Sequence, residues 1–132
     1  IPRVYDFERD RAVGEAPSAC GCCWEADALP DDTSLALVLD GGVFVGTGCA
    51  HAGICNTVAY AKAVTGKNEV LGVLGGFHLF ETGAVLQTTV ETLRALGVRR
   101  VYPAHCTSLA VKSAFFAAME TVEVGVGLTL EW

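Results

Sequence analysis

Short apolar runs alternate with helix-like segments along most of the chain, from residue 34 to residue 118. The runs at 34–39 and 43–45 flank Asp40-Gly41-Gly42, and an Asp-Gly pair between two apolar runs is typical of a β-hairpin. A later run at 70–74 is short and continuously apolar, as in a strand buried on both faces, and residues 100–102 form a further strand. The pattern therefore predicts a hairpin followed by two more strands.

Three segments with helical spacing follow the last three of these strands. Gly66 and Gly97 are placed to end the first two helices, Thr82 is placed to cap the second, and Thr107 or Ser108 is placed to cap the third. The apolar positions that we expect to face inward are Ile54, Val58 and Ala61, then Leu86, Val90 and Leu93, then Val111, Phe115 and Ala118. Repeated strand–loop–helix units imply right-handed crossovers between neighbouring parallel strands, and hence an α/β fold.

The two ends of the chain lack this order. Residues 1–33 are charged and interrupted by prolines and glycines, so we predict an irregular arm or covering loop there, followed by an ordered unit over 34–132. The tail alternates apolar and polar residues at 122–124 and 128–130, which predicts an edge strand or hairpin. The chain starts with Ile1-Pro2-Arg3 and shows no signal-peptide pattern, so we expect a further segment upstream.

Composition and charge narrow the classes of partner. A chain of 132 residues with 52% hydrophobic residues is long and apolar enough for one folded domain. The net charge of −6 and the absence of a basic cluster argue against a nucleic-acid binder. Glycines and polar residues interrupt every apolar stretch before it reaches membrane-spanning length, so we expect a soluble protein that does not bind membranes.

The six cysteines are expected to be reduced thiols in a cytoplasmic protein, because a core this apolar needs no covalent crosslinks. Cys20, Cys22 and Cys23 lie in the sequence Cys-Gly-Cys-Cys, which is too tight for the usual zinc knuckle and has no matching second pair. We interpret this cluster as a surface loop with accessible thiols, with a structural metal site as the alternative.

The histidines carry the clearest chemical signal. His51, His78 and His105 are the only three in the chain, they are 27 residues apart, and each follows the end of a predicted strand. In open α/β sheets the carboxyl ends of the strands form the ligand-binding edge, so the three side chains are expected to gather there. Imidazole binds zinc, iron, copper and nickel, and a catalytic zinc typically has three protein ligands and a water. The alternative is that all three histidines are structural and hydrogen-bonded.

Other groups near these loops have two possible roles. Cys49 and Cys106 lie beside His51 and His105 in the sequence, and each is either a soft metal ligand or a small buried residue. Gly53 and Ile54 begin the first predicted helix, where free backbone N–H groups offer a possible anion site. The spacing of a phosphate-binding P-loop is absent from the sequence.

Four motifs in order resemble the carboxyl-terminal half of the metallo-β-lactamase fold, closest to a subgroup that includes archaeal dihydropterin-related synthases. The motifs are Asp31-Asp32-Thr33-Ser34-Leu35, 47–54 with Asn56-Thr57-Val58, 75–79, and 102–107. The resemblance implies an αββα sandwich with one or two metal ions, zinc or alternatively iron or manganese. It also implies that His51 and His105 are ligands or immediate site residues, and that His78 is a ligand or a substrate-facing, catalytic candidate.

The sequence departs from the pattern of the superfamily in two places. Cys49 stands where many relatives have an aspartate, which makes Cys49 a further candidate ligand. The leading ligand motif His-x-His-x-Asp-His is absent and would belong to a missing amino-terminal half. Without that half, one face of the sheet lacks its packing partner, and a soluble monomer does not tolerate a large exposed apolar face.

The leading functional hypothesis is the carboxyl-terminal portion of a metal-dependent hydrolase-like enzyme, inactive without its upstream half. Its substrate is expected to be a small anionic molecule, such as a phosphoester or a pterin-related compound. The alternative from another class is a non-catalytic module that binds a small anion and forms a homo-oligomer, with a second copy in place of the missing half. A generic α/β domain with structural histidines is the third possibility.

Overall fold

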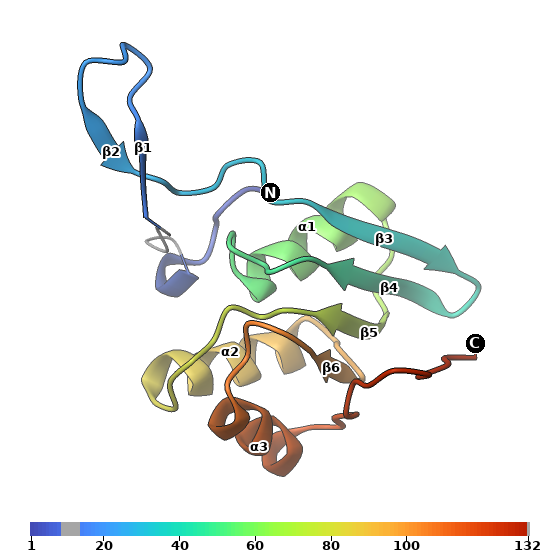
Figure 1. The fold of residues 1–132 in the computed structure, drawn as a ribbon. Coiled ribbons are helices and arrows are strands. Elements are labelled where there is room, and N and C mark those ends of the chain that lie inside the picture. Colours follow the sequence, from blue (N-terminus) through green and yellow to red (C-terminus); the bar gives the residue numbers. More distant parts are fainter. Residues whose placement is uncertain (9–13, 132) are drawn as a thin grey trace.

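The structure, a computed structural model, describes residues 1–8 and 14–131 (Figure 1). Its elements alternate between strands and helices in the predicted order from residue 34 onward. They are the 3₁₀ helix η1 (Asp6–Glu8), β1 (Glu15–Pro17), β2 (Trp24–Ala26), β3 (Ser34–Leu39), β4 (Gly42–Thr47), α1 (Ile54–Thr65), β5 (Val70–Gly75), α2 (Ala84–Ala95), β6 (Val101–Pro103) and α3 (Leu109–Ala118).

The main sheet has four strands in the order β3-β4-β5-β6. The β3–β4 pair is an antiparallel hairpin that turns at Asp40 and Gly41, as the Asp-Gly signal predicts. β4, β5 and β6 are parallel, with α1 and α2 as the crossovers between them. The arrowheads of these three strands point to the same side in Figure 1. Their carboxyl ends therefore share one edge, as the repeated strand–loop–helix pattern predicts.

The core lies between one face of this sheet and the three helices. Val45, Val73 and Val101 are aligned across β4, β5 and β6 and are fully buried. The predicted inward positions of the helices pack against them, with Ala118 only partly buried. Gly66 ends α1 in the left-handed conformation, and the Ser108 hydroxyl accepts a hydrogen bond from the backbone N–H of Val111 at the start of α3. These helix faces and caps are confirmed.

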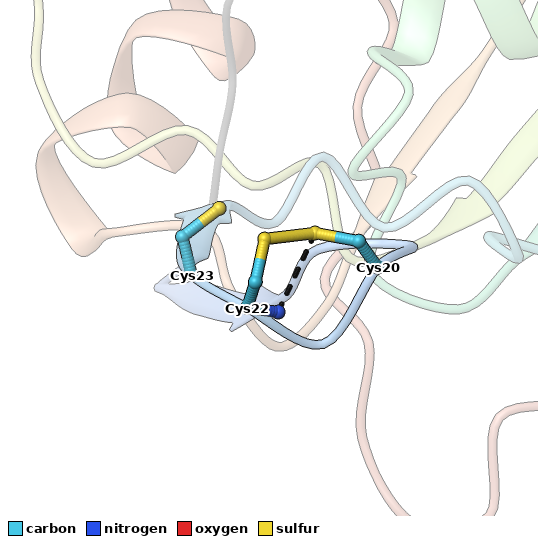
Figure 2. Close-up of side chains that lie close together, drawn as sticks. All are labelled: Cys20, Cys22 and Cys23. Atoms are coloured by element: carbon cyan, nitrogen blue, oxygen red, sulfur yellow. Dashed lines mark hydrogen bonds between the residues drawn. A yellow bond between two sulfur atoms is a disulfide. The ribbon is translucent and has the colours of Figure 1, made fainter.

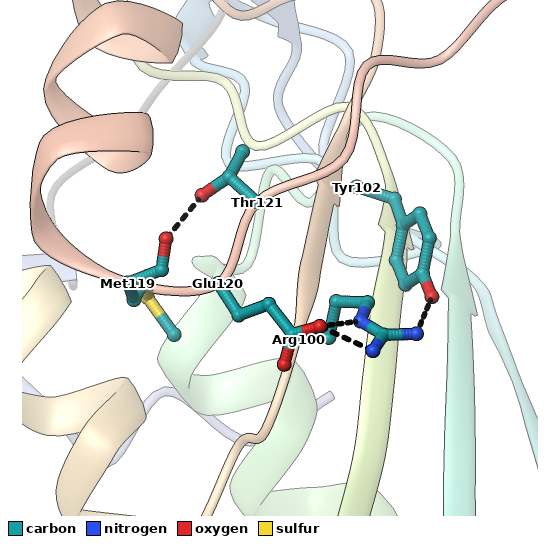
Figure 3. A network of polar contacts seen from close by, with 5 residues as sticks. All are labelled: Arg100, Tyr102, Met119, Glu120 and Thr121. Carbon is teal, nitrogen blue, oxygen red and sulfur yellow. Dashed lines mark hydrogen bonds and ion pairs between the residues drawn. The ribbon is translucent and has the colours of Figure 1, made fainter.

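Two predictions are wrong, the cap at the start of α2 and the strand in the carboxyl-terminal tail. α2 is preceded by Gly83, and no side chain caps it, so Thr82 does not take the predicted role. The tail forms no strand among the described residues after α3; a single bridge joins Thr121 to Val101. β6 is short and ends at Pro103, which has no N–H to extend a ladder. Arg100 instead fixes the start of the tail, because its guanidinium binds both the Glu120 carboxylate and the Tyr102 hydroxyl (Figure 3).

The sheet face away from the helices is only partly covered. Phe44 and Tyr102 meet edge-to-face across Gly72, with ring centroids 5.8 Å apart. Next to them, Leu35 and Leu37 of β3 are 66% and 52% exposed. Leu35 pairs with Gly46 and Leu37 with Phe44, so both leucines point to the same face as the aromatic pair. This open face is the one that the resemblance predicts to be covered by a second half of the fold.

The amino-terminal segment is more ordered than the predicted irregular arm. Tyr5 and Phe7 pack against the core, and Glu8 is fully buried. The buried Asn56 side chain accepts hydrogen bonds from the backbone N–H groups of Val4 and Tyr5, at 2.8 and 3.0 Å. Residues 1–8 therefore belong to the packed unit rather than to a covering loop.

A separate hairpin, β1–β2, carries the Cys-Gly-Cys-Cys cluster, and within residues 1–8 and 14–131 it pairs with no other strand. Cys20 and Cys22 form a disulfide, which differs from the expectation of reduced thiols. The turn at Gly21 brings their Cα atoms to 5.3 Å, within the range that a disulfide requires. Among the described residues, no helix combines the length and apolar content that crossing a bilayer needs.

Candidate metal site at the carboxyl edge of the sheet

Three loops meet where β4, β5 and β6 end, and backbone hydrogen bonds join them. The N–H of Gly76 in the second loop donates to the carbonyl of Gly48 in the first, at 2.8 Å. The N–H of Ala104 in the third loop donates to the carbonyl of Gly75, and Leu79 donates to Cys106. The loops that carry the predicted site residues are thus a connected layer rather than three independent connections.

Each loop holds one non-glycine residue in the left-handed backbone region. These residues are Ala50, His78 and Cys106, with φ between 48° and 54°. This conformation costs about 1–3 kcal/mol for each residue, and such residues cluster at functional sites. Of the four non-glycine residues with positive φ in the described ranges, three lie at this edge. The loop backbones are therefore held in costly conformations that set the direction of the site side chains.

Cys49, His105 and Cys106 form one group of candidate metal ligands, which we call the ligand group. The Cys49 sulfur lies 3.3 Å from Nε2 of His105 and 3.6 Å from the Cys106 sulfur. The three ligand atoms all lie within 4.8 Å of one another, which is close enough for one ion to reach all of them. Two thiols and one imidazole suit zinc or a softer ion. The structure thus brings together His105, Cys49 and Cys106, three candidate ligands that the sequence had suggested.

His51 and His78 lie together in a second group. Their rings meet edge-to-face with centroids 4.6 Å apart, and the His78 ring also contacts Phe80 at 5.0 Å. Both histidines are half-buried. Within residues 1–8 and 14–131, the ligand group around His105 includes neither of them. The sheet edge therefore gathers all three predicted histidines, but as a pair beside a separate Cys–His–Cys group.

Burial raises the pKa of the Cys49 thiol above its ordinary value. The hydrogen bond with Cys106 and the charge of Asp32 act in the same direction. The Asp32 carboxylate is held near the site because it accepts a hydrogen bond from the N–H of Ala52 at 2.9 Å. Without a cation, the Cys49 sulfur at neutral pH is therefore a protonated thiol, and metal binding must displace its proton.

Gly76 lies directly against His105. A Cβ atom at this position would lie 2.8 Å from the His105 carbonyl oxygen, 2.9 Å from the Gly48 carbonyl oxygen and 3.0 Å from Nε2 of His105. Two of these neighbours are backbone atoms, which cannot move without shifting the loops. The absence of a side chain at Gly76 is what lets the first and third loops approach each other.

We expect Gly76→Ala to destabilise the protein by about 1–3 kcal/mol, because the added methyl group overpacks the layer of loops. Thermal unfolding measures this effect. The matched control is Gly125→Ala, since nothing lies within 4 Å of a Cβ at Gly125, which is exposed and lies outside the helices and strands. Equal melting temperatures for the two variants would show that the loops are not packed as described.

The predicted anion site at Gly53 and Ile54 is filled by the chain itself. The buried carboxylate of Glu8 accepts hydrogen bonds from the N–H groups of Cys55 and Asn56, at 3.1 and 2.9 Å. Gly53 has a φ of 96°, and a Cβ there would lie 2.2 Å from a Glu8 oxygen. The helix start does bind an anionic group, as expected from its free N–H groups, but that group is an internal carboxylate.

Comparison with known proteins gives a consistent assignment. No model of a protein family matches the chain. The chain is 33% identical over 90 residues to the 7,8-dihydropterin-6-methyl-4-(β-D-ribofuranosyl)-aminobenzene-5′-phosphate synthase of Methanocaldococcus jannaschii, covering 67% of this chain and 31% of that protein. It is 30% identical over 108 residues to an uncharacterized protein of the same organism, covering 81% of this chain and 38% of that one.

A solved structure shows the same fold. The crystal structure of Tm1679, a metal-dependent hydrolase of the β-lactamase superfamily, superposes with a TM-score of 0.69 at 29% sequence identity. The match covers 75% of this chain and 40% of Tm1679. The chain thus spans about a third of the curated relatives that it matches. From its fold and its sequence similarity, the chain belongs to the metallo-β-lactamase superfamily.

Proposed function

We propose that this chain supplies one side of the active site of a metal-dependent, hydrolase-like enzyme. The observation that carries the proposal is the gathering of His51, His78, His105 and two cysteines at one sheet edge, in loops that are joined to one another. The proposed substrate is a small anionic molecule, either a phosphoester or a pterin-related compound, by analogy with the named synthase. The proposed location is the cytoplasm.

The donor set fits a metal ion of the zinc class. Cys49, His105 and Cys106 offer two sulfur atoms and one nitrogen from within one group, and His51 and His78 offer further nitrogens beside it. A bound zinc ion lowers the pKa of its water toward neutrality and polarises the substrate. The chain's own part is to hold the ligands in place through Gly76 and the three left-handed residues of the loops.

The site needs residues beyond those of this chain. The chain corresponds to 40% or less of each relative that it matches, and the sheet face with Leu35 and Leu37 is open. We propose that an amino-terminal half of the enzyme covers this face and completes the ligand set. Residues 1–132 alone are then expected to bind metal but not to turn over substrate.

The test compares residues 1–132 with the same chain extended by the coding sequence upstream of residue 1. Phosphodiesterase activity is measured with bis(p-nitrophenyl) phosphate after loading with zinc, manganese or iron. We expect activity in the extended protein only, and its loss in a His105→Ala variant of that protein. Full activity of residues 1–132 alone would contradict the proposal.

One observation favours a second function, that of a non-catalytic assembly module. A second copy of this chain would also cover the exposed leucines of the open face. In that case the loops at the sheet edge would bind a small anion rather than catalyse a reaction. Light scattering after gel filtration separates the two functions. A stable, metal-free dimer that is broken by Leu35→Lys would support the module, and a monomer would favour the incomplete enzyme.

A further inference from the structure

The tip of the β1–β2 hairpin is a second cluster of metal-binding side chains, apart from the sheet edge. It consists of residues 18–23 and contains Cys20, Cys22 and Cys23, all of which are exposed (Figure 2). Two backbone hydrogen bonds close the tip: Gly21 N–H donates to the Ser18 carbonyl at 2.8 Å, and Ser18 N–H donates to the Cys23 carbonyl at 2.9 Å. The backbone therefore holds the three cysteines in one tight turn.

The three sulfur atoms lie within 4.8 Å of one another. Cys20 and Cys22 are joined as a disulfide, and Cys23 keeps a free thiol. The Ser18 hydroxyl connects the two sides, since its oxygen lies 3.2 Å from both the Cys20 and the Cys23 sulfur. The oxidised tip thus already places a third sulfur beside the disulfide, and reduction would give three thiols around one centre.

The surroundings favour a cation over thiol–disulfide exchange. The hairpin itself, residues 14–26, contains two carboxylates, Glu15 and Glu25, and no lysine, arginine or histidine. Reactive exchange cysteines depend on nearby positive charge to stabilise a thiolate, and none is present in this segment. A metal cation needs no positively charged neighbour to stabilise the thiolates, because it supplies the positive charge itself. One backbone donor also points at the site: the N–H of Cys22 lies 3.4 Å from the Cys20 sulfur.

We propose that the reduced hairpin tip binds one monovalent copper ion through Cys20, Cys22 and Cys23. Thiolates are soft ligands that select Cu(I), whereas structural zinc almost always takes four protein ligands. Among the described side chains, the group at the tip contains only these three metal ligands. Three sulfurs without a fourth ligand therefore suit the copper ion better than zinc.

Reduction precedes binding and needs an external two-electron reductant, for which a thiol compound is one source. Two thiols of the reductant transfer two electrons and two protons to the Cys20–Cys22 bond, which breaks to give two protein thiols, while the reductant becomes a disulfide. One Cu(I) ion then replaces the three thiol protons, and the complex carries a net charge of −2. The tip is therefore a copper site in its reduced form and a disulfide in its oxidised form.

The experiment titrates the whole chain with Cu(I) under anaerobic conditions, after reduction with a phosphine and in competition with bicinchoninate. The background carries Cys49→Ser and Cys106→Ser, so that the sheet-edge thiols do not contribute. We expect one Cu(I) per chain with release of three protons, and no tight binding before reduction. Cys23→Ser should weaken the affinity about tenfold or more, a loss of at least ~1.4 kcal/mol.

The matched control is Ser18→Ala, which removes a hydroxyl but no ligand and should leave the copper stoichiometry at one. Because β1 and β2 pair only with each other among the strands that the structure describes, the Ser18 and Cys23 substitutions leave the main sheet and its core untouched. The proposal is overturned if Cys23→Ser binds Cu(I) as tightly as the background protein. It is also overturned if the reduced tip prefers Zn(II) to Cu(I).

Discussion

Replacing Glu8 with alanine is expected to lower the free energy of unfolding by about 2–4 kcal/mol, because two buried N–H groups at the start of α1 lose a charged acceptor. The side chain is fully buried and accepts from Cys55 and Asn56. Urea unfolding followed by circular dichroism measures the change. Glu8→Gln should cost less, since the amide oxygen keeps one acceptor.

The control is Glu15→Ala, which removes an exposed carboxylate and is expected to change stability little. A second measurement distinguishes the anion at the helix start from simple packing. Added sulfate should stabilise Glu8→Ala more than the parent protein, because the vacated N–H groups then bind an external anion. If Glu8→Ala and Glu15→Ala unfold at the same urea concentration, the Glu8 carboxylate does not hold the helix start.

His105→Ala is expected to lower the zinc affinity of the chain about a hundredfold or more, since even outer-shell changes cost 10–100-fold. His105 supplies the imidazole of the ligand group, and it contacts both Cys49 and Gly76. Competition with a chromophoric chelator measures the affinity. His51→Ala should have a smaller effect, because His51 lies outside that group.

Cys55→Ser is the matched control for this experiment. Cys55 is a thiol of the same protein, but it is buried in α1 with its sulfur 3.7 Å from the Thr89 carbonyl. The zinc affinity of the Cys55→Ser variant should equal that of the parent chain. If His51→Ala weakens zinc binding more than His105→Ala, the metal is held by the histidine pair and the Cys–His–Cys group is not its site.

Local signals in the sequence were sufficient for most of the fold. The Asp-Gly turn, the glycine after α1 and the serine before α3 each act within a few residues, and the structure confirms them. The strand predicted in the tail does not form. Alternation of apolar and polar residues does not show whether a neighbouring strand has backbone N–H groups available for pairing. Thr82 fails as a cap because the preceding loop places Gly83 at the start of α2.

The site was predictable in its position but not in its grouping. The three histidines follow strands whose carboxyl ends must share an edge once the sheet is parallel, so their gathering follows from topology. The loops that hold these side chains have left-handed backbone at His78 and Cys106, and no local sequence pattern predicts that conformation there. Glu8 was missed because its partner Cys55 is 47 residues away, beyond the reach of any local pattern.

In the proposed site, the sheet edge holds a metal ion through sulfur as well as nitrogen. X-ray absorption at the zinc edge tests it most directly, on residues 1–132 carrying Cys20→Ser, Cys22→Ser and Cys23→Ser and loaded with one equivalent of zinc. We expect a first shell with both sulfur and nitrogen, and loss of the sulfur when Cys49 and Cys106 are also changed to serine. A shell of nitrogen and oxygen alone, unchanged by that double substitution, would contradict it.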